Sequence, residues 1–472
     1  MKRSLLIALT GALFLSTTVK AQLTIDAEVR PRGEYNRGYK KLATAGQDAV
    51  FGISQRTRLK FGYKSEWVDV YVSLQDIRMW GSAPQLTTAN GSTTWLHQAY
   101  GVGHVAKWLD IKLGRQEIIL DDHRIFGSVG WAQQARSHDA AVFQFKPDDK
   151  TKIDVGVAYN VPTTATTMTA NANGSISSKT ANVSTPAGNY RTLQYLWFNR
   201  SFGKVKASVL FLNNGKQIIK SDSVTHTDSG TKLYYDQDAI YFTQTLGARL
   251  GYAAEKIQVF GAVYYEMGNS GGYSAVANNA IDDITITRKK VDAILARLDV
   301  SGIVGPITLS GGYEFQSGNS QINPGTADKA FSPFYGTNHK FNGLMDYFYV
   351  GNHFGSVGLH DAFFGLKFKK NKFWTGATAH YFLAGNDVAD AANPGAAMSS
   401  GLGAEIDFLL GYNINPKFGV LLGYSHLFAT ETLVALKGGQ AKQPHNWGFL
   451  MITYKPRIFD SSNYQLKQKK ES

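Results

Sequence analysis

The stretch that decides the fold is "LTIDAEVR", Leu23 to Arg30, in which apolar and polar residues alternate one by one. In an extended chain, Leu23, Ile25, Ala27 and Val29 fall on one side and the polar residues fall on the other. A period of two residues therefore predicts a strand with one apolar face and one polar face.

The same period returns along most of the chain. It recurs in "SQRTRLKFGY" (54–63), in the run 307–316 and in "GAEIDFLLGY" (403–412). Runs of about ten alternating residues are typical of strands with one face in lipid and one in water.

Short and long connections alternate between these runs. Short turns are expected near 65–68, 106–108, 147–151, 201–204, 254–256, 302–305, 369–372 and 413–417, and long polar loops at 163–188, 220–236, 267–283, 319–357 and 386–400. The runs number about 18, an even number that returns both chain ends to one side. We therefore expect an all-β fold, a transmembrane antiparallel up-and-down β-barrel with short periplasmic turns and long extracellular loops. A soluble sandwich has no reason to follow this two-sided rule.

The two ends of the chain differ from the rest. Residues 1–21 begin with the basic pair Lys2 and Arg3, followed by a short apolar run and a Val-x-Ala site, which predicts a cleaved signal peptide. Residues 22–459 form the expected barrel, whose last strand closes on the aromatic Phe459 as outer-membrane barrels commonly do, and 460–472 form a polar tail.

Composition narrows the functional classes. Cysteine is absent, which excludes disulfides, thiolate metal sites and a cysteine nucleophile. The formal charge of +13 favours an anionic partner. We find no nucleic-acid-binding motif, and the positive charges are scattered along strands, so no nucleic acid is expected as a partner.

A barrel of about 18 strands leaves an aqueous lumen, and inward charges then form its lining. Strand alternation alone places Arg30, Arg56, Arg58 and Arg249 on the inner face. For each of them, the alternative is a solvated charge paired with a neighbour across the lumen.

The segment "GRQEIILDDHRIFGSVGWAQQARSHDA" (114–140) is crowded with charge. Arg115 and Glu117 share a strand face with Leu113, which should be apolar. An arginine facing lipid costs about 2 to 4 kcal/mol at mid-bilayer. We therefore expect a bulge near Gly114 that turns Arg115 and Glu117 into the lumen.

Catalysis and metal binding are weaker explanations of this segment. Ser137, His138 and Asp139 are adjacent in a strand and point to opposite faces, so they cannot form a triad among themselves. The spacing of Asp121, Asp122 and His123 matches no metal-binding loop. We expect no cofactor, no metal and no enzymatic activity.

Two long motifs, 113–140 and "FSPFYGTNHKFNGLMDYFYVGN" (331–352), resemble signature segments of the alginate export family of outer-membrane porins. The resemblance implies an 18-stranded barrel that passes an anionic uronate polysaccharide through an electropositive constriction. It implies that Arg115 and Glu117 form the constriction. Asp122, Arg124, Arg136 and Asp139 lie in the same segment and are expected to help line it.

The expected function is thus passive diffusion of an alginate-like polyuronate, or a related anionic solute, through an arginine-lined lumen in the outer membrane. The alternative is a general or uptake porin for small anions or sugars, and a barrel hydrolase is a distant third. Expected partners are outer-membrane lipid and lipopolysaccharide, the barrel assembly machinery and periplasmic secretion proteins. The sequence leaves open the substrate, the direction of transport, the oligomeric state and calcium binding by a loop.

Overall fold

The computed structural model describes residues 21–83, 85, 94–161, 165–170, 176–181, 190–220, 232–275, 284–353 and 356–462. Nearly all of the expected signal peptide, most of the polar tail and parts of the loops expected at 163–188, 220–236 and 267–283 lie outside these residues. The division of the chain at residues 21 and 459 stays a prediction.

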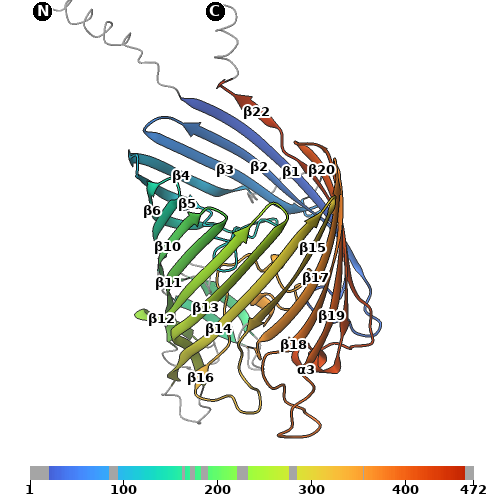
Figure 1. Cartoon of the computed structure of the whole chain (residues 1–472). Coiled ribbons are helices and arrows are strands. Elements are labelled where there is room, and N and C mark those ends of the chain that lie inside the picture. The colour runs from blue at the N-terminus through green and yellow to red at the C-terminus, as the bar shows by residue number, and fades with distance from the viewer. Residues whose placement is uncertain are drawn as a thin grey trace, which may run out of the picture.

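Within the described ranges, 18 antiparallel strands close into a barrel (Figure 1). They are β1 (Gln22–Arg37), β2 (Val50–Lys64), β3 (Val68–Met79), β4 (Thr94–Ala106), β5 (Leu109–Gln116), β6 (His138–Asp148), β7 (Thr151–Tyr159), β10 (Thr192–Phe202), β11 (Val205–Lys220), β12 (Lys232–Ala253), β13 (Ile257–Ala275), β14 (Ile284–Val304), β15 (Ile307–Gln316), β17 (Leu359–Lys370), β18 (Phe373–Ala384), β19 (Gly401–Asn415), β20 (Phe418–Ala429) and β21 (His445–Tyr454). Pairing of β21 with β1 closes the ring, which confirms the expected fold class.

Shorter elements decorate the barrel. β8 (Ala165–Ala170) and β9 (Ile176–Ala181) form a hairpin that pairs with β12, and β16 (Ala327–Asp328) pairs with β14. β22 (Arg457–Asp460) pairs with the start of β1, where Phe459 lies opposite Ile25. The described helical turns are η2 (Asn338–Lys340), α2 (Val350–His353) and α3 (Glu431–Lys437). No helix in the described part of the chain is long and apolar enough to cross a membrane.

The alternation in β1 separates the two faces of the barrel wall as expected. Glu28 and Arg30 point inward and are buried, whereas Leu23 and Tyr35 lie on the outer face and are exposed. Large exposed apolar side chains cover the outside of most strands. An apolar belt of this extent is stable in contact with lipid, as on a transmembrane barrel.

The short connections lie together at one end of the barrel. Gln22 pairs with Lys64, beside the turn that joins β2 to β3, so the described N-terminal end lies at that end, and β22 lies there as well (Figure 1). The strands differ in length, from 8 residues in β5 to 22 in β12. The opposite rim is therefore low at β5 and high at β12.

Two long segments fold into the barrel. Residues 117–137, between β5 and β6, bury Ile125 and Phe126 against the inner wall. Residues 331–353, between β15 and β17, bury Met345 and Phe348 in a second apolar cluster. The expectation of a polar external loop over 319–357 is therefore wrong for residues 331–353, whereas residues 321–326 are mostly exposed. The apolar side chains of residues 331–353 are stable only where they are removed from water.

Candidate functional site

Arginines on the inner face of β1 and β2 hold the first inward segment. The guanidinium of Arg30 donates to the carbonyl oxygens of Gly130 (2.8 Å) and Trp131 (3.0 Å) and to the Gln133 side chain (3.0 Å). Arg56 bonds to Glu28 (2.9 Å) and to the carbonyl oxygens of Gly130 and Gln133 (both 3.3 Å). These arginines face inward as expected, but they donate hydrogen bonds to backbone carbonyl oxygens of the first inward segment.

The other two arginines placed by alternation also face inward. Arg58 donates to Gln75 Oε1 (2.6 Å) and is buried. Arg249 lies 4.5 Å over the ring of Phe260 and makes no hydrogen bond or ion pair with the described residues. Of the four, Arg56 is the one that forms an ion pair in the described part of the chain.

The structure does not place Arg115 and Asp139 in the lumen. They are opposite each other in the β5–β6 ladder and form an ion pair of 2.9 Å, and both are exposed. Arg115 Nε also donates to the carbonyl of Leu96 (3.0 Å). The pair lies on the outer face at the outer ends of β5 and β6, so the expected inward turn of Arg115 is wrong. Ionic pairing at the rim removes the cost that motivated the expectation.

The expectation of a bulge near Gly114 is wrong, because β5 pairs regularly with both neighbouring strands through this residue. A bulge lies instead on the neighbouring strand β4. The β3–β4 register passes from Ser73–Gln98 to Leu74–Leu96, which leaves His97 as the extra residue. His97 is buried and bonds to Glu117 (Nε2 to Oε1, 2.9 Å). Glu117 does face inward, because β5 ends at Gln116 and the chain turns into the lumen.

Ser137 joins this contact. Its Oγ lies 3.1 Å from His97 Nδ1 and donates to the carbonyl oxygen of His97 (2.6 Å). Together with Glu117, Ser137 holds His97 at the bulge of β4.

Arg124 crosses the lumen. It is 2% exposed and forms a close ion pair with Glu314 on β15, with Asn342 Oδ1 at 3.3 Å. Asp122 accepts from the backbone N–H of Arg124 (3.3 Å), and its carbonyl oxygen accepts from Lys340 (2.9 Å). Both residues lie inside as expected, where they join the two inward segments.

Arg136 also joins the two inward segments. It donates to the carbonyl of Gly336 (3.1 Å), and burial lowers its pKa to about 10. Nearby, Gly127 N–H donates to the carbonyl of Tyr335 (2.9 Å), and the rings of Phe126 and Tyr335 stack with centroids 5.6 Å apart. The two segments thus form one body inside the barrel.

Strand carboxylates hold the second segment. Glu266 accepts from Ser332 N–H (2.9 Å), and Glu405 accepts from Met345 N–H (2.7 Å). Asn342 Nδ2 bonds to Glu314 (3.0 Å) and Asp361 (3.1 Å). The sequence placed Glu314 and Glu405 on polar strand faces, but it gave no sign of this anchoring role.

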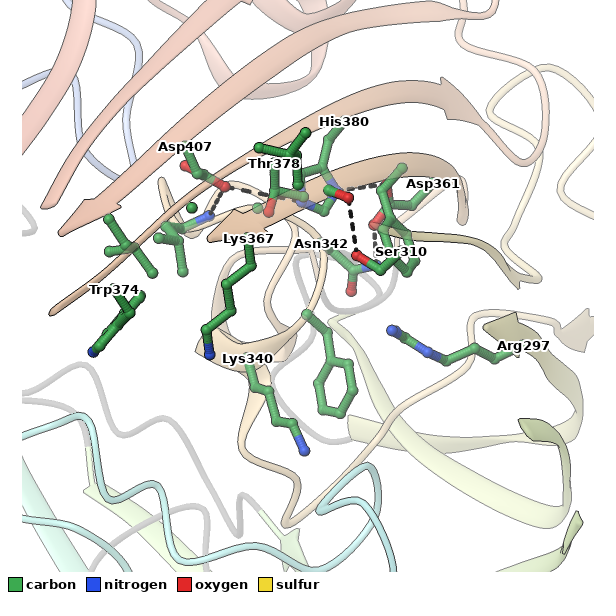
Figure 2. Close-up of a pocket in the computed structure, with 18 residues that line it drawn as sticks. Arg297, Ser310, Lys340, Asn342, Asp361, Lys367, Trp374, Thr378, His380 and Asp407 are labelled. Atoms are coloured by element: carbon green, nitrogen blue, oxygen red, sulfur yellow. Dashed lines mark hydrogen bonds and ion pairs between the residues drawn. The ribbon is translucent and has the colours of Figure 1, made fainter. Parts of the chain in front are cut away.

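A cavity of about 370 Å³ remains between the second segment and the inner wall of β15, β17, β18 and β19 (Figure 2). Its cations are Arg297, Lys340 and Lys367, which Figure 2 shows around one space. Lys367 Nζ lies 4.8 Å over the ring of Trp374. Phe341 and Phe363 also line the cavity.

The acids of this cavity are already engaged. His380 bonds to Asp361 (2.9 Å) and lies 3.8 Å from Asp407. Arg297 pairs with Asp299 (2.7 Å) and Glu314 (3.0 Å). Lys340 and Lys367 make no ion pair in the described part of the chain, although burial lowers the pKa of Lys340 against the opposing effect of Asp122.

We did not predict this cavity. Alternation along β17 puts Asp361, Phe363 and Lys367 on one face, so the sequence pattern does indicate that these three side chains face the lumen together. It does not place Lys340 with them, because we expected residues 319–357 outside. No three metal-binding side chains converge within the described ranges.

Known proteins resemble this chain in three-dimensional structure but not in sequence. No family model matches the chain, and no curated protein is similar to it in sequence. Solved structures do match this chain in fold. OccAB4 of Acinetobacter baumannii has a TM-score of 0.55 at 11% identity and covers 92% of this chain and 98% of its own. A BenF-like porin from Pseudomonas fluorescens Pf-5 has a TM-score of 0.55 at 10% identity and covers 92% and 99%.

The fold is that of the outer-membrane porins. A third porin structure, Pseudomonas aeruginosa OpdK with vanillate, has a TM-score of 0.51 at 10% identity and covers 92% of this chain and 98% of its own. At such identities the likeness to porins shows the fold. The resemblance to the alginate export family receives no support, since no family model matches.

Proposed function

We propose that this protein is an outer-membrane channel for the passive diffusion of small anionic solutes, in particular aromatic carboxylates. The observation that carries the proposal is the cavity with Arg297, Lys340 and Lys367 among aromatic rings. Fixed cations lower the barrier for an anion, and ring faces accept an apolar body. The acids there pair with His380 and Arg297, and neither Lys340 nor Lys367 forms an ion pair with the described residues.

The porin fold supports this proposal. The OpdK structure was solved with vanillate, an aromatic carboxylate of the proposed class. The apolar outer face fits outer-membrane lipid as the surroundings of the barrel. Assembly by the barrel machinery and secretion partners stay predictions.

A polyuronate is a poorer substrate for this lumen. Arg124 and Glu314 tie the first inward segment to the opposite wall, and both segments are tied to each other. A polymer would have to break these buried contacts to pass, whereas a small anion fits beside them. The proposed function is therefore the small-solute alternative of the sequence analysis.

Planar bilayers test the proposal. We expect anion-selective conductance in a KCl gradient, and blockade of the current by vanillate but much less by uncharged vanillyl alcohol. Lys340→Gln and Lys367→Gln should each lower the anion-to-cation permeability ratio. Lys370→Gln, on the same strand but at the rim, is the matched control. Cation selectivity, or equal effects of all three variants, contradicts the proposal, as does ester hydrolysis without conductance.

A further inference from the structure

A second cavity, of about 360 Å³, lies on the inner wall of β3 to β7. In the strand order of the barrel, β5 lies halfway round from β17, so this cavity faces the cationic one. Ile118 to Leu120 of the first inward segment form one side of it. Its remaining lining is mostly polar and includes Tyr71, Gln98, Tyr100, Lys112, Gln144 and Asp154.

The second cavity holds one lysine and two carboxylates. Lys112 makes no ion pair in the described part of the chain, and Glu117 and Asp154 lie close enough to act on its charge. An anion drawn by Lys112 would meet both carboxylates. The cavity therefore offers no net attraction for the anions that the opposite wall suits.

Two tyrosines supply flat apolar surface. Tyr71 and Tyr100 are cross-strand partners, with ring centroids 5.4 Å apart, and both rings are half-buried. Lys112 Nζ lies 4.0 Å from the centre of the Tyr100 ring, which fixes that cation at the wall. Tyrosine rings pack against apolar faces while their hydroxyls remain available for hydrogen bonds.

The amides provide both donors and acceptors. Gln98 Oε1 accepts from Glu117 N–H (3.1 Å), which leaves its amino group to donate. Gln144 lies opposite Asp154 in the β6–β7 ladder, so an amide and a carboxylate stand side by side. Such a mixture suits a group that both donates and accepts, which is the property of a hydroxyl.

We propose that this second cavity binds a neutral, hydroxyl-rich solute of the size of a mono- or disaccharide. Ring faces cover the apolar side of the sugar, and Gln98, Gln144 and Asp154 bond to its hydroxyls. The volume lies within the range of small-molecule sites, about 300–1,000 Å³. The proposal rests on the proposed channel only in needing an open path to this wall.

Calorimetry and conductance on the purified full-length protein test the proposal together. We expect maltose or glucose to bind in titration calorimetry and to reduce the channel current. Gln144→Leu and Asp154→Leu should weaken both effects about five- to tenfold, the cost of a lost hydrogen bond. Lys367→Gln, on the opposite wall, should leave sugar binding unchanged and should weaken only the vanillate blockade.

The outcomes separate this inference from the proposed function. Sugar binding without anion conductance supports the second site and overturns the channel. Anion-selective conductance with no sugar binding at tens of millimolar overturns the second site alone. Equal loss of sugar binding in Lys367→Gln and Asp154→Leu also overturns it, because the two walls would then act as one site.

Discussion

Strand parity decides which face of the barrel wall a side chain occupies, and the neighbouring residues decide which contacts it makes. Alternation put Arg30, Arg56 and Arg58 on the inner face, and they are there. It could not show that a segment 100 residues away in sequence presents carbonyl oxygens to Arg30. A buried guanidinium needs its donors satisfied, so the arginine wall and the inward segment depend on each other.

Replacing Arg30 with methionine should loosen the first inward segment. The variant loses the charge-assisted hydrogen bonds of Arg30 to residues 130–133, each worth about 1.5–3 kcal/mol, while methionine keeps the apolar stem. We expect a larger and noisier single-channel conductance. Lys60→Met, which removes only a partner of Glu28 on the same wall, is the control. An unchanged conductance in Arg30→Met would mean that the segment is held by other contacts.

Gly343 permits the close approach of the second segment to β19. Its φ is +81°, and a Cβ there would lie 2.5 Å from Glu405 Oε1. Gly343→Ala should cost about 1–3 kcal/mol from backbone strain, with the clash in addition. We expect faster limited proteolysis near residue 343. Gly325→Ala, with φ of +64° in open space, isolates the backbone term, and equal proteolysis of the two variants would remove the role of the Glu405 contact.

Among the elements, β5 shows how a short strand redirects the chain. With only 8 residues it ends at Gln116, and the next residues enter the lumen, where Glu117 meets His97 at the bulge of β4. The irregularity that we expected near Gly114 is not in β5, which pairs regularly through Gly114 and Arg115. The bulge of β4 at His97 leaves the parity of β5 unchanged, and Glu117 turns inward because the strand has ended.

The outward position of Arg115 gives a clear prediction for β5. Arg115→Met and Asp139→Asn should leave conductance and anion selectivity unchanged, because neither side chain reaches the lumen. Stability should change by only about 0–1 kcal/mol, as for charges near a membrane interface. Reversal potentials in a salt gradient measure the selectivity. A fall in anion selectivity in Arg115→Met, but not in Asp139→Asn, would return Arg115 to the lumen.

At the scale of the whole molecule, two segments from opposite walls meet inside the barrel. The first is held by the basic wall of β1 and β2, and the second by carboxylates from β13 to β19. The arginines bind backbone carbonyl oxygens, and the carboxylates accept from backbone N–H groups. The solute is left with the cations that form no ion pair in the described part of the chain, chiefly Lys367 and Lys340, although Lys340 also donates to the carbonyl oxygen of Asp122.

A cross-link between the segments tests whether they separate during transport. The chain has no cysteine, so Phe126→Cys with Tyr335→Cys introduces a single pair at adjacent backbone positions. We expect vanillate blockade and conductance to stay within about twofold when this pair is oxidised, since small solutes pass beside the joined segments. Each single-cysteine variant is the control. Loss of conductance that a reductant restores would show that passage requires the segments to part.

The sequence by itself determined the barrel, its strand number, its two-sided connections and the inward face of the early arginines. These features follow from local periodicity and turn length, which the chain carries residue by residue. Only the tertiary structure decided that residues 117–137 and 331–353 fold inside, that Arg115 faces out, and that Lys340 shares a cavity with Lys367. Those outcomes depend on which carbonyl, amide or carboxylate stands opposite across the lumen, and no local pattern records a partner 200 residues away.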